Sequence, residues 1–194
     1  MTPKILTKRL QLDPLRSTDA PTLWAYRSRP EVARYLSWVP ETLEDAETYV
    51  RESEEVPFQT PGTWFQLAIR LRESDRLLGD LGLHFLAEDD RRMELGFAID
   101  PSHQRKGYAS EALRGLLGYL FRELKIREVK ASADPLNQAS IALLDSLGFR
   151  RLAQRSKSFW FKGEWVDDLP FVLPCEEWRS ATEGNGATSE RHGV

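Results

Sequence analysis

The segment that organises this chain runs Phe97-Ala98-Ile99-Asp100-Pro101-Ser102-His103-Gln104-Arg105-Lys106-Gly107-Tyr108-Ala109. Its apolar start predicts a strand that ends at a proline-marked turn, and its basic, glycine-containing end predicts a loop that opens a helix. Free backbone N–H groups and the positive end of the helix then lie beside two side-chain cations, an arrangement that suits a pyrophosphate. The short side chains at Gly107 and Ala109 let an anion approach the backbone closely, and Gly107 can adopt dihedral angles closed to other residues.

The loop differs from two common phosphate-binding loops. No Gly-Lys-Ser/Thr sequence is formed at Gly107, which excludes the loop of P-loop nucleotide-binding proteins. The segment also lacks the G-x-G-x-x-G pattern of dinucleotide-binding proteins. The sequence therefore predicts a pyrophosphate-binding loop of a different class.

Regular spacings of apolar residues, typical of helices and strands, lie on both sides of the loop. Residues 107–124 carry apolar side chains at i, i+3, i+4 and i+7, which predicts a helix with a broad buried face. Before the loop, three apolar segments separated by polar turns predict an antiparallel meander. These segments span residues 64–71, 77–86 and 93–99. After the helix, a strand at 129–133 and a helix at 137–147 are predicted.

The two ends of the chain complete the pattern. The predicted N-terminal elements are a strand at 9–15, a helix that Ser17 or Asp19 caps and Pro30 ends, and a helix at about 42–54. The predicted C-terminal elements are strands at 149–157 and 159–173, the second interrupted by a turn at 162–164.

The resulting element order is β-α-α-β-β-β-α-β-α-β-β. Antiparallel strands that lead into a β-α-β unit predict a single α/β (α+β) domain with a mixed, mostly antiparallel central sheet of about seven strands flanked by helices. That domain is expected to span residues 1–178. Residues 179–194 are rich in Ser, Thr, Gly and Glu and are expected to form a disordered tail.

The composition narrows the class of protein. The 27 Lys and Arg residues nearly balance the 30 Asp and Glu residues, for a net charge of −3, which argues against a general nucleic-acid or membrane binder. The single cysteine, Cys175, forms no internal disulfide, and no Cys/His spacing indicates zinc or another metal site. No signal peptide or membrane span is evident, so a cytoplasmic protein is expected.

Four segments, taken in order over about residues 7–174, resemble the GNAT superfamily of N-acetyltransferases. The loop Gln104-Arg105-Lys106-Gly107-Tyr108-Ala109 is similar to the family's Q/R-x-x-G-x-G/A acyl-CoA loop, and Glu94-Leu95-Gly96-Phe97 is similar to the strand before it. Thr7-Lys8-Arg9-Leu10-Gln11-Leu12 and Pro30-Glu31-Val32-Ala33-Arg34-Tyr35-Leu36 resemble the start of the RimJ/RimL-like branch, the ribosomal-protein N-terminal acetyltransferases. Asn137-Gln138-Ala139-Ser140, with Leu147-Gly148-Phe149, resembles the N-x-x-S…G-F element of the last motif.

The resemblance implies where acetyl-CoA binds. It would lie in a V-shaped gap where the strand at 93–99 diverges from the strand at 129–133. Backbone groups of 97–99 would hold the pantetheine arm, backbone N–H groups of 105–110 would cradle the pyrophosphate, and Asn137 would hold pantetheine or fix the start of its helix. The implied binding set is Phe97, Ala98, Ile99, Gln104, Arg105, Lys106, Gly107, Tyr108, Ala109, Ser110 and Asn137. Arg105 and Lys106 are expected to contact phosphate, the alternative being solvated loop charges.

Two residues are candidates for proton transfer, and no metal is required. In the RimJ/RimL-like branch a serine at the position of Ser140 is a suggested proton donor to the departing thiolate, whereas Ser is also common in the first turn of a helix. Glu94 is the candidate base, with an ion-paired sheet residue as the alternative. The acidic residue that this branch sometimes carries soon after G-F has no match here, since Arg150 and Arg151 stand there.

Other residues leave alternatives open. His84 and His103 have suitable intrinsic pKa values, but His84 is expected to be a half-buried strand residue and His103 to be exposed in the loop. Asp134 likewise has two alternatives, a role in proton transfer or a structural role. Four tryptophans are candidates either for an acceptor pocket or for the core: Trp24, Trp38, Trp64 and Trp160.

The function that the resemblance implies is acetyl-CoA-dependent N-acetyl transfer to a primary amine, for which a protein N-terminal α-amine is one acceptor. A small-molecule amine, such as a polyamine, an amino acid or an aminoglycoside, is the alternative acceptor. A non-catalytic acyl-CoA sensor is the alternative from another class. The amine is the expected partner, without nucleic acid or membrane, and a homodimer would be unsurprising for this branch.

Overall fold

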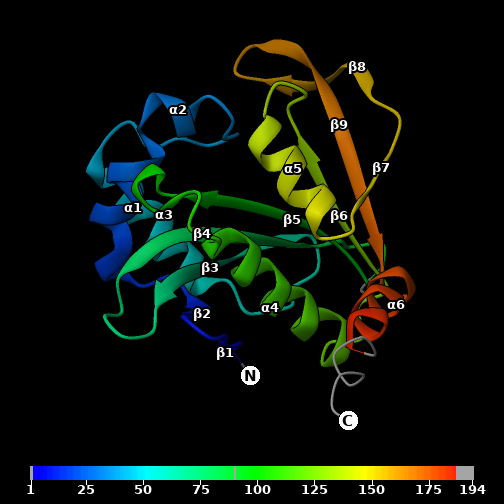
Figure 1. Ribbon diagram of the computed structural model, residues 1–194. Coiled ribbons are helices and arrows are strands. Elements are labelled where there is room, and N and C mark those ends of the chain that lie inside the picture. The colour runs from blue at the N-terminus through cyan, green and yellow to red at the C-terminus, as the bar shows by residue number, and fades with distance from the viewer. Residues whose placement is uncertain (1, 90, 187–194) are drawn as a thin grey trace.

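The computed structural model describes residues 2–89 and 91–186 (Figure 1). Its sheet has nine strands among these residues, in the order β1-β2-β3-β4-β5-β6-β9-β7, and β8 pairs with β9. Every pair is antiparallel except β5 with β6, which is parallel. The strands are β1 (Ile5–Leu6), β2 (Leu10–Pro14), β3 (Thr63–Leu71), β4 (Leu77–Phe85), β5 (Arg92–Ile99), β6 (Glu128–Ala133), β7 (Arg150–Arg151), β8 (Arg155–Phe161) and β9 (Glu164–Pro174).

The predicted mixed α/β sheet is confirmed. Strands β1 and β7 have only 2 residues each, and the other described strands follow the predicted order. The helices among the described residues are α1 (Ala20–Arg27), α2 (Pro30–Ala33), α3 (Leu43–Glu55), α4 (Tyr108–Arg122), α5 (Gln138–Ser146) and α6 (Cys175–Gly186). At the start of α3, Thr42 Oγ1 accepts from the N–H of Asp45 at 3.2 Å and the Asp45 carboxylate accepts from the N–H of Thr42 at 2.8 Å. This capping box explains why the helix begins where the sequence predicts.

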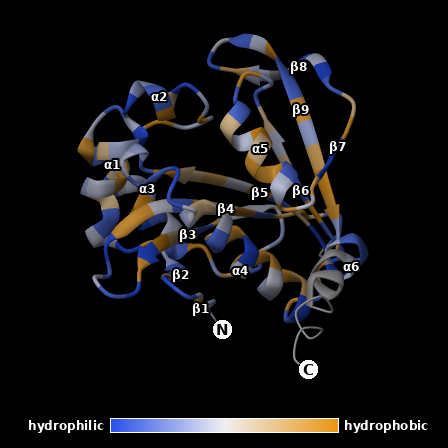
Figure 2. Cartoon of the chain, in the orientation of Figure 1, coloured by the Kyte–Doolittle hydropathy of each residue, from blue (hydrophilic) through white to orange (hydrophobic). Residues whose placement is uncertain are grey.

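The two faces of the sheet have different partners. Along β5, Leu95 and Ile99 belong to the apolar cluster that includes α4, whereas Ala98 belongs to the cluster that includes α1 and α3. This alternation is the period of a strand, and it places helices on both faces. The buried face of α4 consists of Ala112, Leu113, Leu116, Leu117, Leu120 and Phe121. Figure 2 accordingly shows both hydrophobic and hydrophilic colours along α4.

The C-terminal hairpin differs from the prediction. The turn at Lys162 and Gly163 does not interrupt one strand but joins β8 to β9. Both residues have positive φ, 48° and 88°, as two-residue hairpin turns require, so the chain reverses there. The predicted strand at 149–157 is correspondingly divided into β7 and the start of β8.

Helix α6 occupies part of the segment in which the sequence predicts disorder. Trp178 is buried and its ring centroid lies 5.4 Å from that of Phe121 on α4. The N–H of Cys175 donates to the carbonyl of Arg127 at 2.8 Å. These two contacts attach the start of α6 to the domain, and the structure describes the helix through Gly186. The rest of the predicted tail, residues 187–194, lies outside the described residues.

Strands β5 and β6 separate partway along their length. Their paired positions run only from Arg92 with Glu128 to Leu95 with Ala131. Beyond this point β5 stays paired with β4 up to Ile99, while β6 stays paired with β9 up to Ala133. We call this divergence, visible in Figure 1, the split.

Candidate active site

The loop between β5 and α4 lies at the end of the β5 side of the split. Asp100 Oδ1 accepts from the N–H of Ser102 at 3.0 Å and so starts a 3-10 turn over Pro101–His103. Arg105 and Gly107 then have positive φ, 60° and 77°, and Gly107 is the N-cap of α4. No side chain of the described residues caps this helix, so its first-turn N–H groups face an exposed glycine loop. Such a helix start favours an anion.

Two loop side chains that the resemblance assigns to acetyl-CoA make contacts within the loop. Gln104 Nε2 donates to the carbonyl of Ile99 at 3.0 Å, and Lys106 Nζ donates to the carbonyl of Ser102 at 2.8 Å. Gln104 therefore fixes the path of the loop against the end of β5.

His103 is buried, contrary to the prediction that it is exposed. Its side chain turns back within the 3-10 turn, and Nδ1 lies 3.1 Å from Asp100 Oδ2. Burial alone would raise the pKa of Asp100, but hydrogen bonds from Ser102 and His103 outweigh it and lower that pKa. The pair therefore stabilises the start of the loop.

Glu94 belongs to a row of side chains across three strands. The register places Trp64 on β3 opposite His84 on β4, and His84 opposite Glu94 on β5. The Trp64 and His84 rings are stacked, with centroids 4.9 Å apart and planes 10° from parallel. His84 Nδ1 lies 3.3 Å from Glu94 Oε2, and the Glu94 side chain is 46% exposed. The row therefore holds an accessible carboxylate in place.

The next row along the same face contains two glycines and a buried amide. Gly82 lies opposite Gly96, and a Cβ on Gly82 would come within 2.9 Å of Trp64 Cε3, so the absence of a side chain lets Trp64 lie on the sheet. Gln66, opposite Gly82, is only 8% exposed, and its Oε1 has no hydrogen-bond partner among the described residues. A buried polar atom of this kind requires an explanation. Sequence alone does not single out Gln66, because only the strand register places it opposite Gly82.

Ser140 and Asn137 lie on the β6 side of the split. Asn137 Oδ1 accepts from the N–H of Ser140 at 3.1 Å, so Asn137 caps α5 and Ser140 stands in its first turn. Within residues 2–89 and 91–186, no hydrogen bond involves the Ser140 hydroxyl. Asp134 Oδ1 accepts from the N–H of Leu136 at 2.7 Å, so this carboxylate stabilises the turn before the helix.

Two contacts connect the sides of the molecule around the split. Tyr35 Oη donates to the carbonyl of Leu136 at 3.4 Å, and Lys162 Nζ donates to the carbonyl of Ala33 at 2.5 Å. The end of α2 thus contacts the tip of the β8–β9 hairpin, and Tyr35 just after α2 contacts the turn before α5.

The candidate tryptophans separate into different environments. Trp64 lies in the row with Glu94, whereas Trp38 stacks on Tyr49 beside the α1–α3 cluster. Trp24 is exposed on α1, and Trp160 is exposed on the hairpin against Trp165. Of these four tryptophans, Trp64 is the one in the same row as the carboxylate of Glu94.

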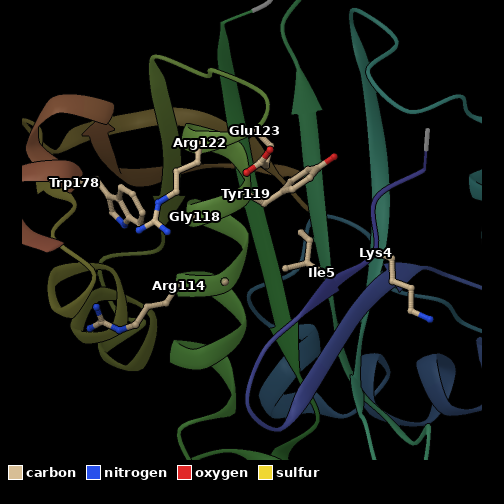
Figure 3. Close-up of a pocket in the computed structure, with 9 residues that line it drawn as sticks. Lys4, Ile5, Arg114, Gly118, Tyr119, Arg122, Glu123 and Trp178 are labelled. Atoms are coloured by element: carbon tan, nitrogen blue, oxygen red, sulfur yellow. The ribbon is translucent and has the colours of Figure 1, made fainter. Parts of the chain in front are cut away.

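A hollow of about 390 Å³ lies away from these residues. It is formed between β1, α4 and α6, and Arg114, Arg122 and Trp178 are among the side chains around it (Figure 3). None of the residues expected to bind acetyl-CoA lines it. Among the described residues, no group of three or more His, Cys, Asp or Glu side chains is placed to hold a metal ion, and no helix is long and apolar enough to cross a membrane.

A split sheet with a glycine loop at an uncapped helix start is an arrangement that suits a phosphate-bearing ligand. Residues 9–150 match the family model described as the acetyltransferase (GNAT) domain. The chain belongs to the GNAT family, and it is an N-acetyltransferase with the GNAT fold.

Two similar proteins match over nearly their whole length, and a third matches over less than half of it. The N-acetyltransferase p20 of Bacillus licheniformis is 29% identical over 175 residues, which cover 90% of this chain and 97% of that protein. The GNAT-family acetyltransferase from Bacillus anthracis is 26% identical, with a TM-score of 0.79 over 90% of this chain and 100% of that one. The [ribosomal protein uS5]-alanine N-acetyltransferase of Escherichia coli is 31% identical over 84 residues, 43% of each chain.

Proposed function

We propose that this enzyme transfers an acetyl group from acetyl-CoA to a primary amine, with the α-amine of a protein N-terminus as its acceptor. The observation that carries the proposal is the split, with a glycine loop and an uncapped helix start at its end. The E. coli relative, named for alanine acetylation of a ribosomal protein, supports a protein acceptor. Mycobacterium smegmatis RimJ, which shares the fold at a TM-score of 0.77 and 18% identity, has a structure in complex with CoA-disulfide.

The residues around the split fit acetyl-CoA. Phe97, Ala98 and Ile99 continue β5 beyond its last paired position with β6, so their backbone is suited to holding an extended pantetheine arm. The backbone N–H groups from Arg105 to Ser110 would hold the pyrophosphate, with Tyr108 and Ala109 in the first helical turn. Gln104 supports this loop, and Asn137 orients the helix that carries Ser140.

The chemistry needs a base, an acid and a polarised carbonyl. The amine nitrogen attacks the thioester carbonyl carbon, a C–N bond forms, and the C–S bond breaks. Glu94 accepts the proton that the amine loses, and Ser140 donates a proton to the departing sulfur. The proton held by Glu94 then returns through water to the Ser140 oxygen, so both side chains regain their starting states. The backbone N–H near Ile99 would stabilise the oxyanion.

Saturating acetyl-CoA should raise the melting temperature of the protein. A ligand specific to the folded state adds about 2.7 kcal/mol of stability at 100 times its Kd. NAD and ATP should have smaller effects, because the loop lacks their motifs. Differential scanning calorimetry measures the shift, and a melting temperature unchanged by acetyl-CoA and CoA would contradict the proposal.

A thiol-release assay with acetyl-CoA then identifies the acceptor. We expect release with N-terminal peptides, and a panel of polyamines, amino acids and aminoglycosides tests the small-molecule alternative. Stabilisation without thiol release from any amine would indicate a sensor instead. A homodimer stays a prediction, which sedimentation velocity can check.

Ser140→Ala should lower kcat by about 10–100-fold with little change in the KM for acetyl-CoA. A proton donor acts mainly in the transition state, and a thiolate is a good leaving group, so the effect lies at or below the low end for general acids. The melting temperature should stay near that of the unmodified protein, because Asn137 and not Ser140 caps α5.

Asn137→Ala is the matched control for Ser140→Ala. Removing the cap should cost about 1 kcal/mol of stability. Measuring kcat and melting temperature on both variants separates the two roles. Normal turnover in Ser140→Ala would end the proton-donor assignment.

A further inference from the structure

Arg9 connects the N-terminal strands to the start of α4. Its Nε donates to Glu111 Oε2 at 2.6 Å, and its backbone N–H donates to Glu111 Oε1 at 2.6 Å. Its guanidinium also lies over the Tyr108 ring, 4.4 Å from the centroid. Glu111 is in the first turn of α4, so these contacts orient Arg9 against the helix start.

The carboxylate that anchors Arg9 is itself held firmly. Thr7 Oγ1 donates to Glu111 Oε1 at 2.6 Å and accepts from the N–H of Leu10 at 3.0 Å. Burial alone would raise the pKa of Glu111, but the hydrogen bonds from Thr7 and Arg9 outweigh it and lower that pKa. An ionised Glu111 therefore fixes the guanidinium at neutral pH.

The far end of the guanidinium reaches the glycine loop. Arg9 Nη1 donates to the carbonyl of Lys106 at 3.1 Å, and Nη2 lies 3.4 Å from the place a Cβ on Gly107 would take. Within the described part of the chain, Nη2 makes no hydrogen bond, and the Arg9 side chain is 41% exposed. A charged donor thus remains available beside the N-cap of α4.

We propose that Arg9 is a phosphate-binding residue of this enzyme: Nη2 donates to the pyrophosphate of CoA, while Nη1 holds the Lys106 carbonyl and so fixes the loop. The inference rests on the proposed use of acetyl-CoA. Lys106 Nζ is engaged with the Ser102 carbonyl, so Arg9 supplies a cation that is already oriented. A guanidinium is well suited to this task, since its planar group can bond carboxylate, carbonyl and phosphate at once.

Arg9→Met tests the inference through the affinity for CoA, measured by isothermal titration calorimetry. A hydrogen bond to a charged group contributes enough that its loss should raise the Kd about 10–100-fold. Arg72→Met is the matched control, because Arg72 Nη1 donates to the Thr7 carbonyl at 2.8 Å on the same segment. Among the described residues, the Arg72 side chain makes no hydrogen bond to the glycine loop. Its Kd for CoA should equal that of the unmodified protein.

S-acetylpantetheine, which lacks the pyrophosphate, gives the second readout. Arg9→Met should raise the KM for acetyl-CoA but leave kcat/KM for S-acetylpantetheine unchanged. Equal losses with both donors would mean general damage to the enzyme and would overturn the inference. So would an unchanged Kd for CoA in Arg9→Met.

Arg9→Lys covers the case in which Arg9→Met does not fold. It keeps the charge but cannot make all three contacts, so the Kd for CoA should rise about 3–10-fold. An unchanged Kd for CoA in Arg9→Lys would then contradict the assignment of Arg9 as a phosphate-binding residue. Failure of the unmodified protein to bind CoA would instead contradict the proposed function.

Discussion

Gly107→Val should weaken CoA binding by at least about 100-fold while the protein still folds. At a φ of 77°, a β-branched residue is strained, and strain of this kind costs roughly 1–3 kcal/mol. The new Cβ would also lie 3.4 Å from Arg9 Nη2, and its methyl groups would crowd the N–H groups of the first turn of α4. Because the loop is exposed, the strain should not unfold the domain. Isothermal titration with CoA measures the effect.

Gly163→Val is the matched control for this experiment. Gly163 has a similar φ of 88°, but it lies in the β8–β9 turn, and a Cβ there meets no atom of the described residues within 4 Å. It should therefore carry a comparable backbone cost without a change in the Kd for CoA. Unchanged CoA affinity in Gly107→Val would remove the loop from the binding site.

Glu94→Gln should lower kcat at neutral pH by about 10²–10⁴-fold, the usual range for a lost general base. The amide keeps the shape of the side chain beside His84 but cannot accept the proton. The residual rate should still climb at high pH, where the acceptor amine loses its proton unaided. A kcat–pH profile measures both effects, and the Kd for CoA should stay unchanged.

Glu128→Gln controls for the loss of a nearby negative charge. Glu128 pairs with Arg92 across the parallel β5–β6 register, outside the row that contains Glu94. The Glu128→Gln variant should have the same kcat and the same kcat–pH profile as the unmodified enzyme. A Glu94→Gln variant with normal turnover would show that another group removes the proton.

The parts of the fold that depend on neighbouring residues could be predicted from the sequence. The apolar period over 107–124 predicted α4, and the helix predicted at about 42–54 corresponds to α3. The glycine loop was also predictable, since its chemistry lies in six consecutive residues. The turn at 162–164 was predicted, but its role in joining two strands was not, because Lys162 takes a positive φ that hairpin turns usually leave to Asn, Asp or Gly.

Features that depend on long-range contacts could not be predicted in this way. Trp178 contacts Phe121 only in the folded chain, because the two residues are far apart in the sequence. That contact helps to hold α6 against α4. The row of Trp64, His84 and Glu94 requires the register of three strands, which a shift of one residue would destroy. Arg9 is likewise far from Glu111 in sequence, so only the structure reveals its place beside the loop.

The split also has a consequence for self-association. Divergence of β5 from β6 creates two strand edges in the middle of the sheet, and exposed edges are templates for pairing with other chains. The Tyr35–Leu136 and Lys162–Ala33 hydrogen bonds join segments on the two sides of the split. At the outer edges, β1 has only two residues, and the opposite edge consists of the two-residue β7, formed by Arg150 and Arg151, together with the seven-residue β8. A ligand held along β5 in the split would cover an edge that is otherwise open to another strand.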